Sequence, residues 1–187
     1  VGVKDVFAKF PMMSGPEFVA LRKAGKLYNN ATDEADDVNT DWQDNFYKTG
    51  MVNSHDLGVA GGTENGSYNF NAGYYNEKGV IPTQQYTRYS VRAALDQGVG
   101  KHLRFGFTSY NNYNVTEGSN VGLYGILSMS PIANPYNADG TWKRTVKMPL
   151  DEQWVYSRDI VEDLQDKWLS ETRALGTYNT LYGEVKI

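Results

Sequence analysis

The chain has 187 residues and a formal net charge of −4, from 18 basic and 22 acidic side chains, and it contains no cysteine. The mildly acidic balance disfavours a nucleic-acid-binding surface, which needs a basic stripe, and the lack of cysteine excludes disulfides and thiolate metal sites. No apolar run approaches the roughly 20 residues of a membrane-spanning helix. What remains is a chain rich in tyrosine and glycine, with 14 tyrosines and 19 glycines.

Residues 1–50 are predicted to be a connector with one short helix. Ser14 can cap this helix, Pro16 is tolerated in its first turn, and Glu17 completes a capping box. We expect the helix to run to about residue 24 and to stop at Gly25. The acidic segment 33–37 lacks the glycine and the final glutamate of an EF-hand, so a solvated loop is favoured over a calcium site.

Residues 51–113 show the strongest pattern in the chain. Apolar and polar side chains alternate with a period of two in four successive segments, 57–59, 68–75, 88–96 and 103–108. This alternation predicts an antiparallel β-meander. Its connections differ in length, because 61–66 and 96–101 are short and turn-like, whereas 77–85 and 111–171 are longer.

Residues 114–172 form a loop too long to be structureless in a compact domain. We expect helices at 121–129 and 151–169 within it, and a returning strand at 173–187. Three tryptophans of this loop are candidates for contact with a ligand or a covering protein, although anchoring the folded loop is the commoner use of a buried tryptophan: Trp142, Trp154 and Trp168.

Alternation alone fits two architectures. A soluble β-sandwich that binds carbohydrate would place Phe70, Val91 and Phe107 in one dry core. A transmembrane β-barrel would expose them to lipid, and two features favour it: short turns oppose long loops, and tyrosines gather toward the long-loop ends of the strands. We expect these interfacial tyrosines to be Tyr74, Tyr89, Tyr110 and Tyr113.

Several collinear segments resemble the SusC/RagA-type TonB-dependent transporters of Gram-negative outer membranes. Residues 39–44 read NTDWQD, where the family typically has DTDWQD, and residues 55–64 read HDLGVAGGTE, similar to HNLSVSGGTE. Residues 73–81 (GYYNEKGVI) and 88–92 (RYSVR) resemble GYxxQEGIV and RYSLR. Weaker similarities lie at 10–18 (FPMMSGPEF), at 129–131 (MSP) and at 139–140 (DG). Each motif is weak alone, but together they span most of the chain.

The resemblance implies an all-β fold, with this chain forming a portion of a transmembrane antiparallel barrel of about 22 strands. The expected content is the segment after an N-terminal plug (1–50), the first barrel strands (51–113), a partly helical extracellular loop (114–172) and a truncated returning strand (173–187). Terminal strands would be unpaired edges, which lipid does not tolerate, so we expect the chain to be part of a larger protein.

The resemblance also implies a function. It is the import of an oligosaccharide or a peptide across the outer membrane, driven by the TonB complex and assisted by a SusD-like surface lipoprotein. The expected surroundings are the lipid bilayer and the rest of the same transporter, without nucleic acid. No catalytic motif occurs in the secondary-structure context that it requires, so we expect no enzyme activity, no cofactor and no metal site.

On this basis each face of the meander receives a predicted environment. The candidates for facing the lumen, as a hydrated wall or as contacts to solute or plug, are Asn69, Asn71, Tyr75, Arg88, Arg92 and Arg104. The candidates for facing lipid are Tyr68, Phe70, Tyr74, Val91, Leu95, Leu103, Phe105 and Phe107. The turns at 61–66 and 96–101 are predicted to be periplasmic, and residues 77–85 and 111–171 extracellular.

Overall fold

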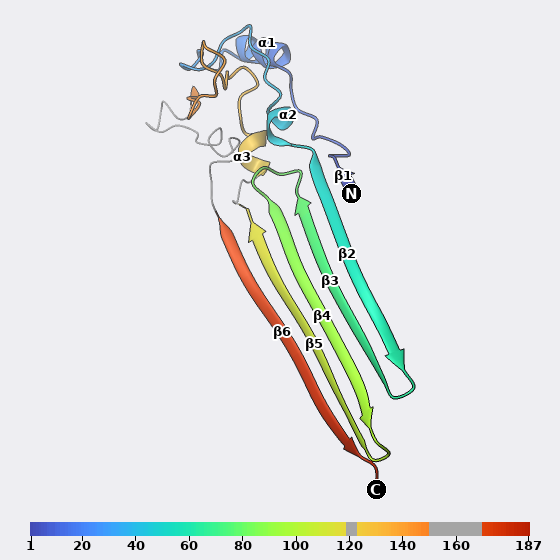
Figure 1. The fold of residues 1–187 in the computed structure, drawn as a ribbon. Coiled ribbons are helices and arrows are strands. Elements are labelled where there is room, and N and C mark those ends of the chain that lie inside the picture. Colours follow the sequence, from blue (N-terminus) through green and yellow to red (C-terminus); the bar gives the residue numbers. More distant parts are fainter. Residues whose placement is uncertain (119–122, 150–169) are drawn as a thin grey trace.

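A computed structural model describes residues 1–118, 123–149 and 170–187. Their main feature is one six-stranded sheet in the order β1-β2-β3-β4-β5-β6, in which each strand pairs antiparallel with the next (Figure 1). The strands are β1 (Gly2–Lys4), β2 (Gly50–Thr63), β3 (Gly66–Lys78), β4 (Gln85–Val99), β5 (Leu103–Glu117) and β6 (Glu171–Val185). The predicted all-β meander is therefore confirmed. It forms an open sheet and not a closed barrel.

The strands β2 to β6 are longer than the alternation predicts. They contain 13 to 15 residues, whereas about 9–11 residues suffice to cross a bilayer. Two predicted turns shrink accordingly, because Gly61 to Thr63 belong to β2 and Asp96 to Val99 belong to β4. At Gly61 the ring of Tyr68 lies so close that a Cβ atom would clash with it. Glycine there makes room for an aromatic neighbour instead of ending the strand.

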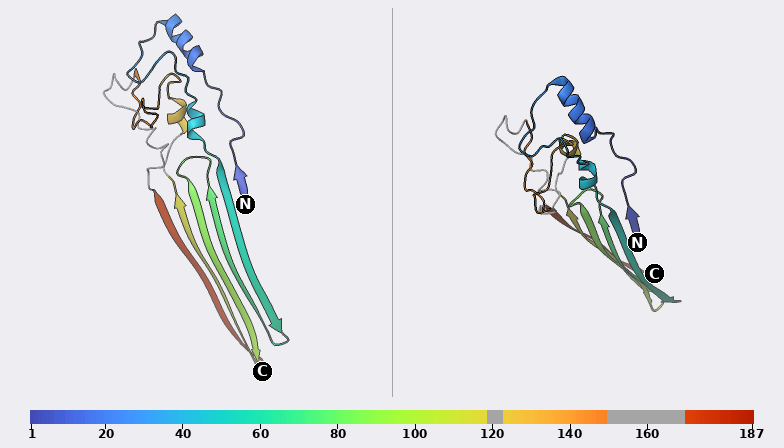
Figure 2. Two further views of the ribbon diagram at one scale, coloured as in Figure 1. Left: turned by 45° about the horizontal axis from the view of Figure 1, so that its top comes forward. Right: turned by 90° about the horizontal axis from the view of Figure 1, so that it is seen from above.

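The three helices of the described residues all lie beyond one end of the sheet: α1 (Gly15–Gly25), α2 (Trp42–Phe46) and α3 (Leu123–Leu127) (Figures 1 and 2). At the start of α1, the Glu17 carboxylate accepts hydrogen bonds from the backbone N–H and the hydroxyl of Ser14, which lowers the pKa of Glu17. The end of this helix differs from the predicted end by one residue. Gly25 is still helical, and Lys26 adopts the left-handed conformation with φ 49°. No helix among the described residues has the length and apolar content needed to cross a membrane.

The hydrophobic core lies among these helices and not under the sheet. We call this region the head and define it as residues 14–48 and 123–149. Its buried cluster consists of Trp42, Phe46, Ile126, Met129, Ala133, Val146 and Met148. The predicted helix at 121–129 is found as the shorter α3, and the helix predicted at 151–169 lies outside the described residues.

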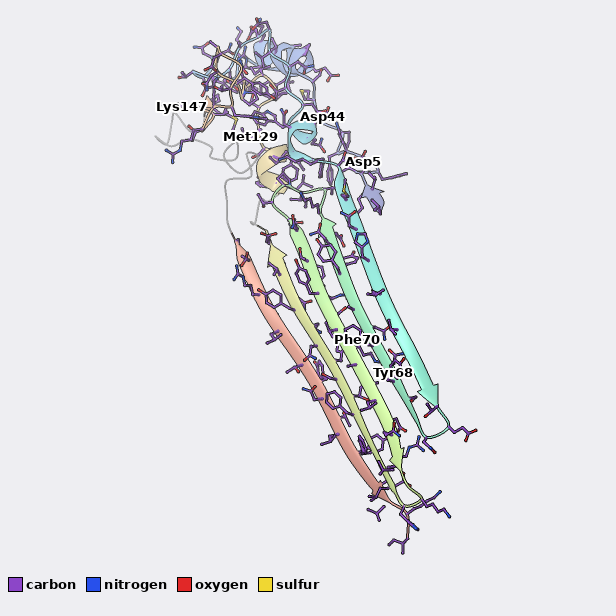
Figure 3. The ribbon with its side chains drawn as sticks, viewed as in Figure 1. Asp5, Asp44, Tyr68, Phe70, Met129 and Lys147 are labelled. Carbon is purple, nitrogen blue, oxygen red and sulfur yellow. The ribbon has the colours of Figure 1, made fainter. Side chains whose placement is uncertain are left out.

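The sheet has no such core. Phe70, Val91 and Phe107 keep 43%, 40% and 37% of their surface exposed, so they do not converge as a β-sandwich requires. Figure 3 shows side chains along the strands without a covering layer, with Tyr68 and Phe70 on β3 far from Met129 of the head. Among the described residues, no second layer covers the large apolar side chains of the sheet.

Candidate functional site

The register assigns every strand residue to one of two faces. Paired residues of an antiparallel sheet share a face, and the alternation continues along each strand. One face, the apolar face, carries all eight residues predicted to meet lipid. For example, Tyr68 pairs with Leu95, and Leu95 pairs with Phe107. The opposite, polar face carries all six residues predicted to line a lumen, with Asn71 paired to Arg92 and Tyr75 paired to Arg88.

One tyrosine lies on the face opposite to the expected one. Tyr110 pairs with Arg92 on β4 and with Tyr178 on β6, so it belongs to the polar face. Its position in the run Ser109-Tyr110-Asn111 explains the difference, because the strand keeps a strict alternation in which the tyrosine falls on a polar position. The other three tyrosines form a row on the apolar face. The rings of Tyr74 and Tyr89 lie 5.3 Å apart, and those of Tyr89 and Tyr113 lie 6.4 Å apart.

The apolar face is interrupted by a polar quartet, Ser109, Asn111, Thr177 and Asn179, near the middle of β5 and β6. Its members are joined in a chain of hydrogen bonds. Asn111 donates to Ser109 (2.8 Å), Thr177 donates to Asn111 (2.6 Å), and Asn179 donates to Thr177 (3.0 Å). Mutual hydrogen bonding offsets the cost of removing polar groups from water. The quartet was not predicted, because the predicted alternation on β5 ended at Thr108 and the residues of β6 had been assigned to neither face.

On the polar face, a cluster of charged and aromatic side chains lies near the head end of β3 and β4. The Arg88 guanidinium stacks over the Tyr75 ring at 5.5 Å. The Tyr75 hydroxyl donates to Glu77 at 2.5 Å, and Lys4 of β1 pairs with the same carboxylate. Arg88 and Tyr75 were predicted together as lumen-facing residues, and the structure brings them into direct contact.

A second cluster lies at the opposite end of the polar face. The Asp96 carboxylate accepts hydrogen bonds from Arg104 (2.8 Å) and from the Tyr182 hydroxyl. The Tyr182 ring lies over Gly106, where a Cβ atom would come within 2.1 Å of the ring. Glycine is therefore required at position 106 for this close approach. Arg104 was predicted as a lumen residue, whereas Tyr182 had no predicted role.

Between these clusters, one row of the polar face crosses three strands with Arg92, Tyr110 and Tyr178. The Tyr110 and Tyr178 rings lie 6.3 Å apart with an interplanar angle of 28°. Of these three residues, only Arg92 was predicted from the sequence to face the lumen, whereas Tyr110 was expected on the apolar face. Tyr178 was missed although the strand was predicted, because the pairing partner that places its ring beside Tyr110 depends on the register between β5 and β6.

The head is held together by contacts between its two segments. Trp42 donates its indole N–H to the Ser130 carbonyl at 2.8 Å, and the Thr40 hydroxyl donates to the Ala133 carbonyl at 2.8 Å. Lys143 forms an ion pair with Asp33 at 2.7 Å. The segment predicted as a connector thus supplies half of a packed structure, and the partner half comes from about 90 to 110 residues further along the chain.

Two acidic side chains of segment 33–37 form ion pairs and hydrogen bonds within the head. Asp33 binds Lys143, while Asp36 accepts hydrogen bonds from Arg22 (2.5 Å) and Asn30 (3.0 Å) and pairs with Lys23 (2.6 Å). These donors, Lys23 first, hold the pKa of Asp36 well below its usual range. Within residues 1–118, 123–149 and 170–187, no group of three or more histidine or acidic side chains is arranged to hold a metal ion.

An open pocket of about 760 Å³ lies between the two segments of the head and the preceding residues 9–13. Its walls include Phe10, Phe18, Met129 and Met148. Glu34 also borders it, and burial together with the Glu34 carboxylate raises the pKa of the nearby Tyr28 hydroxyl. Of the three candidate tryptophans, Trp142 packs against the core and lies 4.7 Å from the Tyr136 ring. Trp154 and Trp168 lie outside the described residues.

Known proteins similar to this chain are TonB-dependent receptors. The TonB-dependent receptor P3 of Formosa agariphila is 27% identical over 138 residues, which cover 67% of this chain and 14% of that protein. The TonB-dependent receptor SusC of Bacteroides thetaiotaomicron is 24% identical over 141 residues, which cover 73% of this chain and 14% of that protein. The chain thus spans about one seventh of the length of these curated relatives. No family model matches it.

Solved structures with a similar fold are those of the RagAB transporter. The RagAB peptide importer in its open-open state superposes over 100% of this chain and 25% of the importer chain, with a TM-score of 0.74 and 18% identity. A further RagAB peptide transporter structure covers 79% of this chain with a TM-score of 0.65 and 17% identity. In both sequence and fold, this chain matches the SusC/RagA-type TonB-dependent receptors.

Proposed function

We propose that this chain forms part of the barrel wall of an outer-membrane receptor that imports a bulky nutrient. The observation that carries the proposal is the sheet itself, in which large apolar side chains stand exposed along one face while arginine, asparagine and tyrosine occupy the other. Lipid and a water-filled lumen are the two environments that stabilise such a wall together. The similarity to receptors named for TonB supports energy supply by the TonB complex.

The surroundings follow from this proposal. The remaining strands and a plug complete the barrel, and a SusD-like surface lipoprotein covers its outer opening. The head is then extracellular, together with the loop at 79–84 between β3 and β4. The two-residue turn at 64–65 and the turn at 100–102 are periplasmic, since long loops face outward in such barrels. The nutrient is an oligosaccharide or a peptide.

Two measurements on the full-length receptor test the proposal. The receptor is expected in the outer-membrane fraction, and deletion of TonB is expected to abolish uptake of its nutrient. A receptor recovered as a detergent-free soluble protein would contradict the barrel assignment, and uptake unchanged without TonB would contradict the energy coupling.

The orientation is tested separately with single cysteines introduced at Asn65 and Asp139. A membrane-impermeant thiol reagent applied to intact cells is expected to modify position 139 and to spare position 65. Both residues are exposed in turns, so reactivity depends on the side of the membrane and not on burial. The reverse labelling pattern would invert the proposed orientation.

A further inference from the structure

Five tyrosines stand on the polar face, and they differ in what their hydroxyl groups do. Three of them tie the hydroxyl to the wall: Tyr75 donates to Glu77, Tyr86 donates to Asn114 at 3.1 Å, and Tyr182 donates to Asp96. Tyr110 and Tyr178 donate to none of the described residues. These two rings are therefore not fixed by hydrogen bonds as the others are.

The two unfixed tyrosines also form a common surface. Their rings are nearly parallel, at 28° and 6.3 Å, and they extend from directly paired positions of β5 and β6. Tyr110 is 36% exposed and Tyr178 is 69% exposed. The adjacent rows of the same two strands carry only small or polar residues, Thr108 with Thr180 on one side and Asn112 with Gly176 on the other. No tall apolar side chain from these rows covers the rings.

Arg92 extends this surface by one strand. It is paired with Tyr110 across β4 and β5, it is exposed, and its guanidinium forms no ion pair or hydrogen bond with the described residues. Arg88 and Arg104 differ, because the first stacks on Tyr75 and the second pairs with Asp96. Arg92 thus keeps its planar set of N–H donors available beside two open aromatic rings.

This arrangement selects for a particular kind of ligand. An aliphatic side chain of a peptide prefers a concave site with apolar walls, whereas this site is a pair of exposed, nearly parallel aromatic rings bordered by hydroxyl, amide and guanidinium groups. A sugar ring has the complementary shape, since its C–H groups form an apolar face and its hydroxyls project from the rim. The rings supply the stacking surface, and Arg92 supplies donors for the hydroxyls.

We propose that Tyr110, Tyr178 and Arg92 form a stacking site for a sugar ring of an oligosaccharide that passes along the lumen wall. The inference rests on the proposed function, because the polar face must border the lumen. It adds a place of contact midway along the strands, away from the head, and it favours oligosaccharide over peptide as the nutrient.

The test uses the purified full-length receptor and a mixture of maltoheptaose, cellohexaose, inulin-type fructan oligomers and a tryptic digest of casein. Mass spectrometry identifies the retained species, and titration calorimetry gives their Kd. The expected result is retention of a sugar by the wild type. The double variant Tyr110→Leu/Tyr178→Leu is expected to weaken its Kd by about tenfold or more, by analogy with the loss of stacking on aromatic side chains in other ligand classes.

Two single variants separate stacking from wall filling. Tyr178→Phe keeps the ring and is expected to bind within about threefold of the wild type, while Tyr178→Leu keeps apolar bulk and is expected to bind at least about fivefold more weakly. Arg92→Gln is expected to weaken binding without changing which sugar is retained. A ring that only fills the wall would be replaced by leucine without loss.

Equal sugar affinity in the wild type and the double leucine variant would overturn the site. Retention of peptides alone, or of nothing in the mixture, would overturn the assignment to sugar. Either failure is distinguishable from failure of the proposed function, which is measured by outer-membrane location and TonB-dependent uptake in cells carrying the same receptor.

Discussion

In the head, large apolar side chains are buried against one another, whereas in the sheet they remain exposed. Phe46 and Ile126 have 0% and 1% of their surface accessible, while Leu57 and Leu181 of the sheet have 65% and 77%. Both regions come from one chain with similar residue types. The head therefore follows the packing rules of water-soluble proteins, whereas the exposed apolar face of the sheet is the feature on which the proposed contact with lipid rests.

Removing core volume from the head is expected to have the largest effect. Phe46→Ala should destabilise the head by about 3–5 kcal/mol, because a fully buried aromatic leaves a cavity, and should leave the strands intact. Protease accessibility of intact cells and the heat-modified mobility of the barrel on gels report the two regions separately. Tyr124→Ala is the matched control, since Tyr124 is 84% exposed. Simultaneous loss of barrel and head would show that the two regions are not independent.

A charge placed on the apolar face of the sheet should have a smaller effect, and it should destabilise the sheet instead of the head. Val91→Arg is expected to cost about 2–4 kcal/mol if position 91 faces the middle of the bilayer. Thr108→Arg on the polar face is the control and should be tolerated. Unfolding of the full-length receptor in lipid vesicles by denaturant provides the measurement. Equal tolerance of both arginines would remove the distinction between the faces.

The cap of α2 offers a finer probe of the head. The Asp41 carboxylate accepts hydrogen bonds from the backbone N–H groups of Gln43 (2.9 Å) and Asp44 (3.1 Å). Asp41→Ala should cost about 1 kcal/mol, seen as faster amide exchange in residues 42–46. Asp41→Asn retains a capping oxygen and should recover most of the protection. An unchanged exchange rate in the alanine variant would show that core packing alone fixes α2.

The smallest expected effect is a dependence on pH. The pKa of Asp36 is lowered, mainly by Lys23 and also by Asn30 and Arg22, so its contribution to stability is present above its ordinary unfolded pKa and is lost only as pH falls through the lower folded value. Between pH 4 and 7 the attachment of α1 should therefore stay constant. Proteolysis near residue 30 provides the readout. Asp36→Asn should increase cleavage at neutral pH, and a wild-type loss already at pH 5 would contradict the assignment.

Sequence reasoning succeeded where a local pattern carries the information. Strict alternation placed all fourteen residues of the two predicted sets on the correct side of the sheet relative to one another, and Ser14 and Glu17 marked the start of α1. Whether those sides meet lipid and lumen stays a prediction. The positions missed depend on distant partners. Tyr178 gains meaning only beside Tyr110, and Trp42 gains its place only against Ser130.

The same dependence explains why the head was not foreseen. In its first segment only α1 was predicted, because α2 has just five residues and is stabilised by packing against the second segment. Propensity summed over a short window cannot report such packing. Glycine misled the prediction of one turn boundary in a related way, since Gly61 belongs to β2 and accommodates the ring of Tyr68 from the neighbouring strand.

The hydrogen bonds between residues 31–48 and 123–149 have a consequence for the order of assembly. The four strands β2 to β5 lie between these two segments in the chain. Bringing the segments together early would close a loop of about 90 residues before any local contact offset the lost entropy. Pairing of β2 to β5 as successive hairpins brings both segments to the same end of the sheet. We therefore expect the head to fold after the sheet, as a late step of biogenesis.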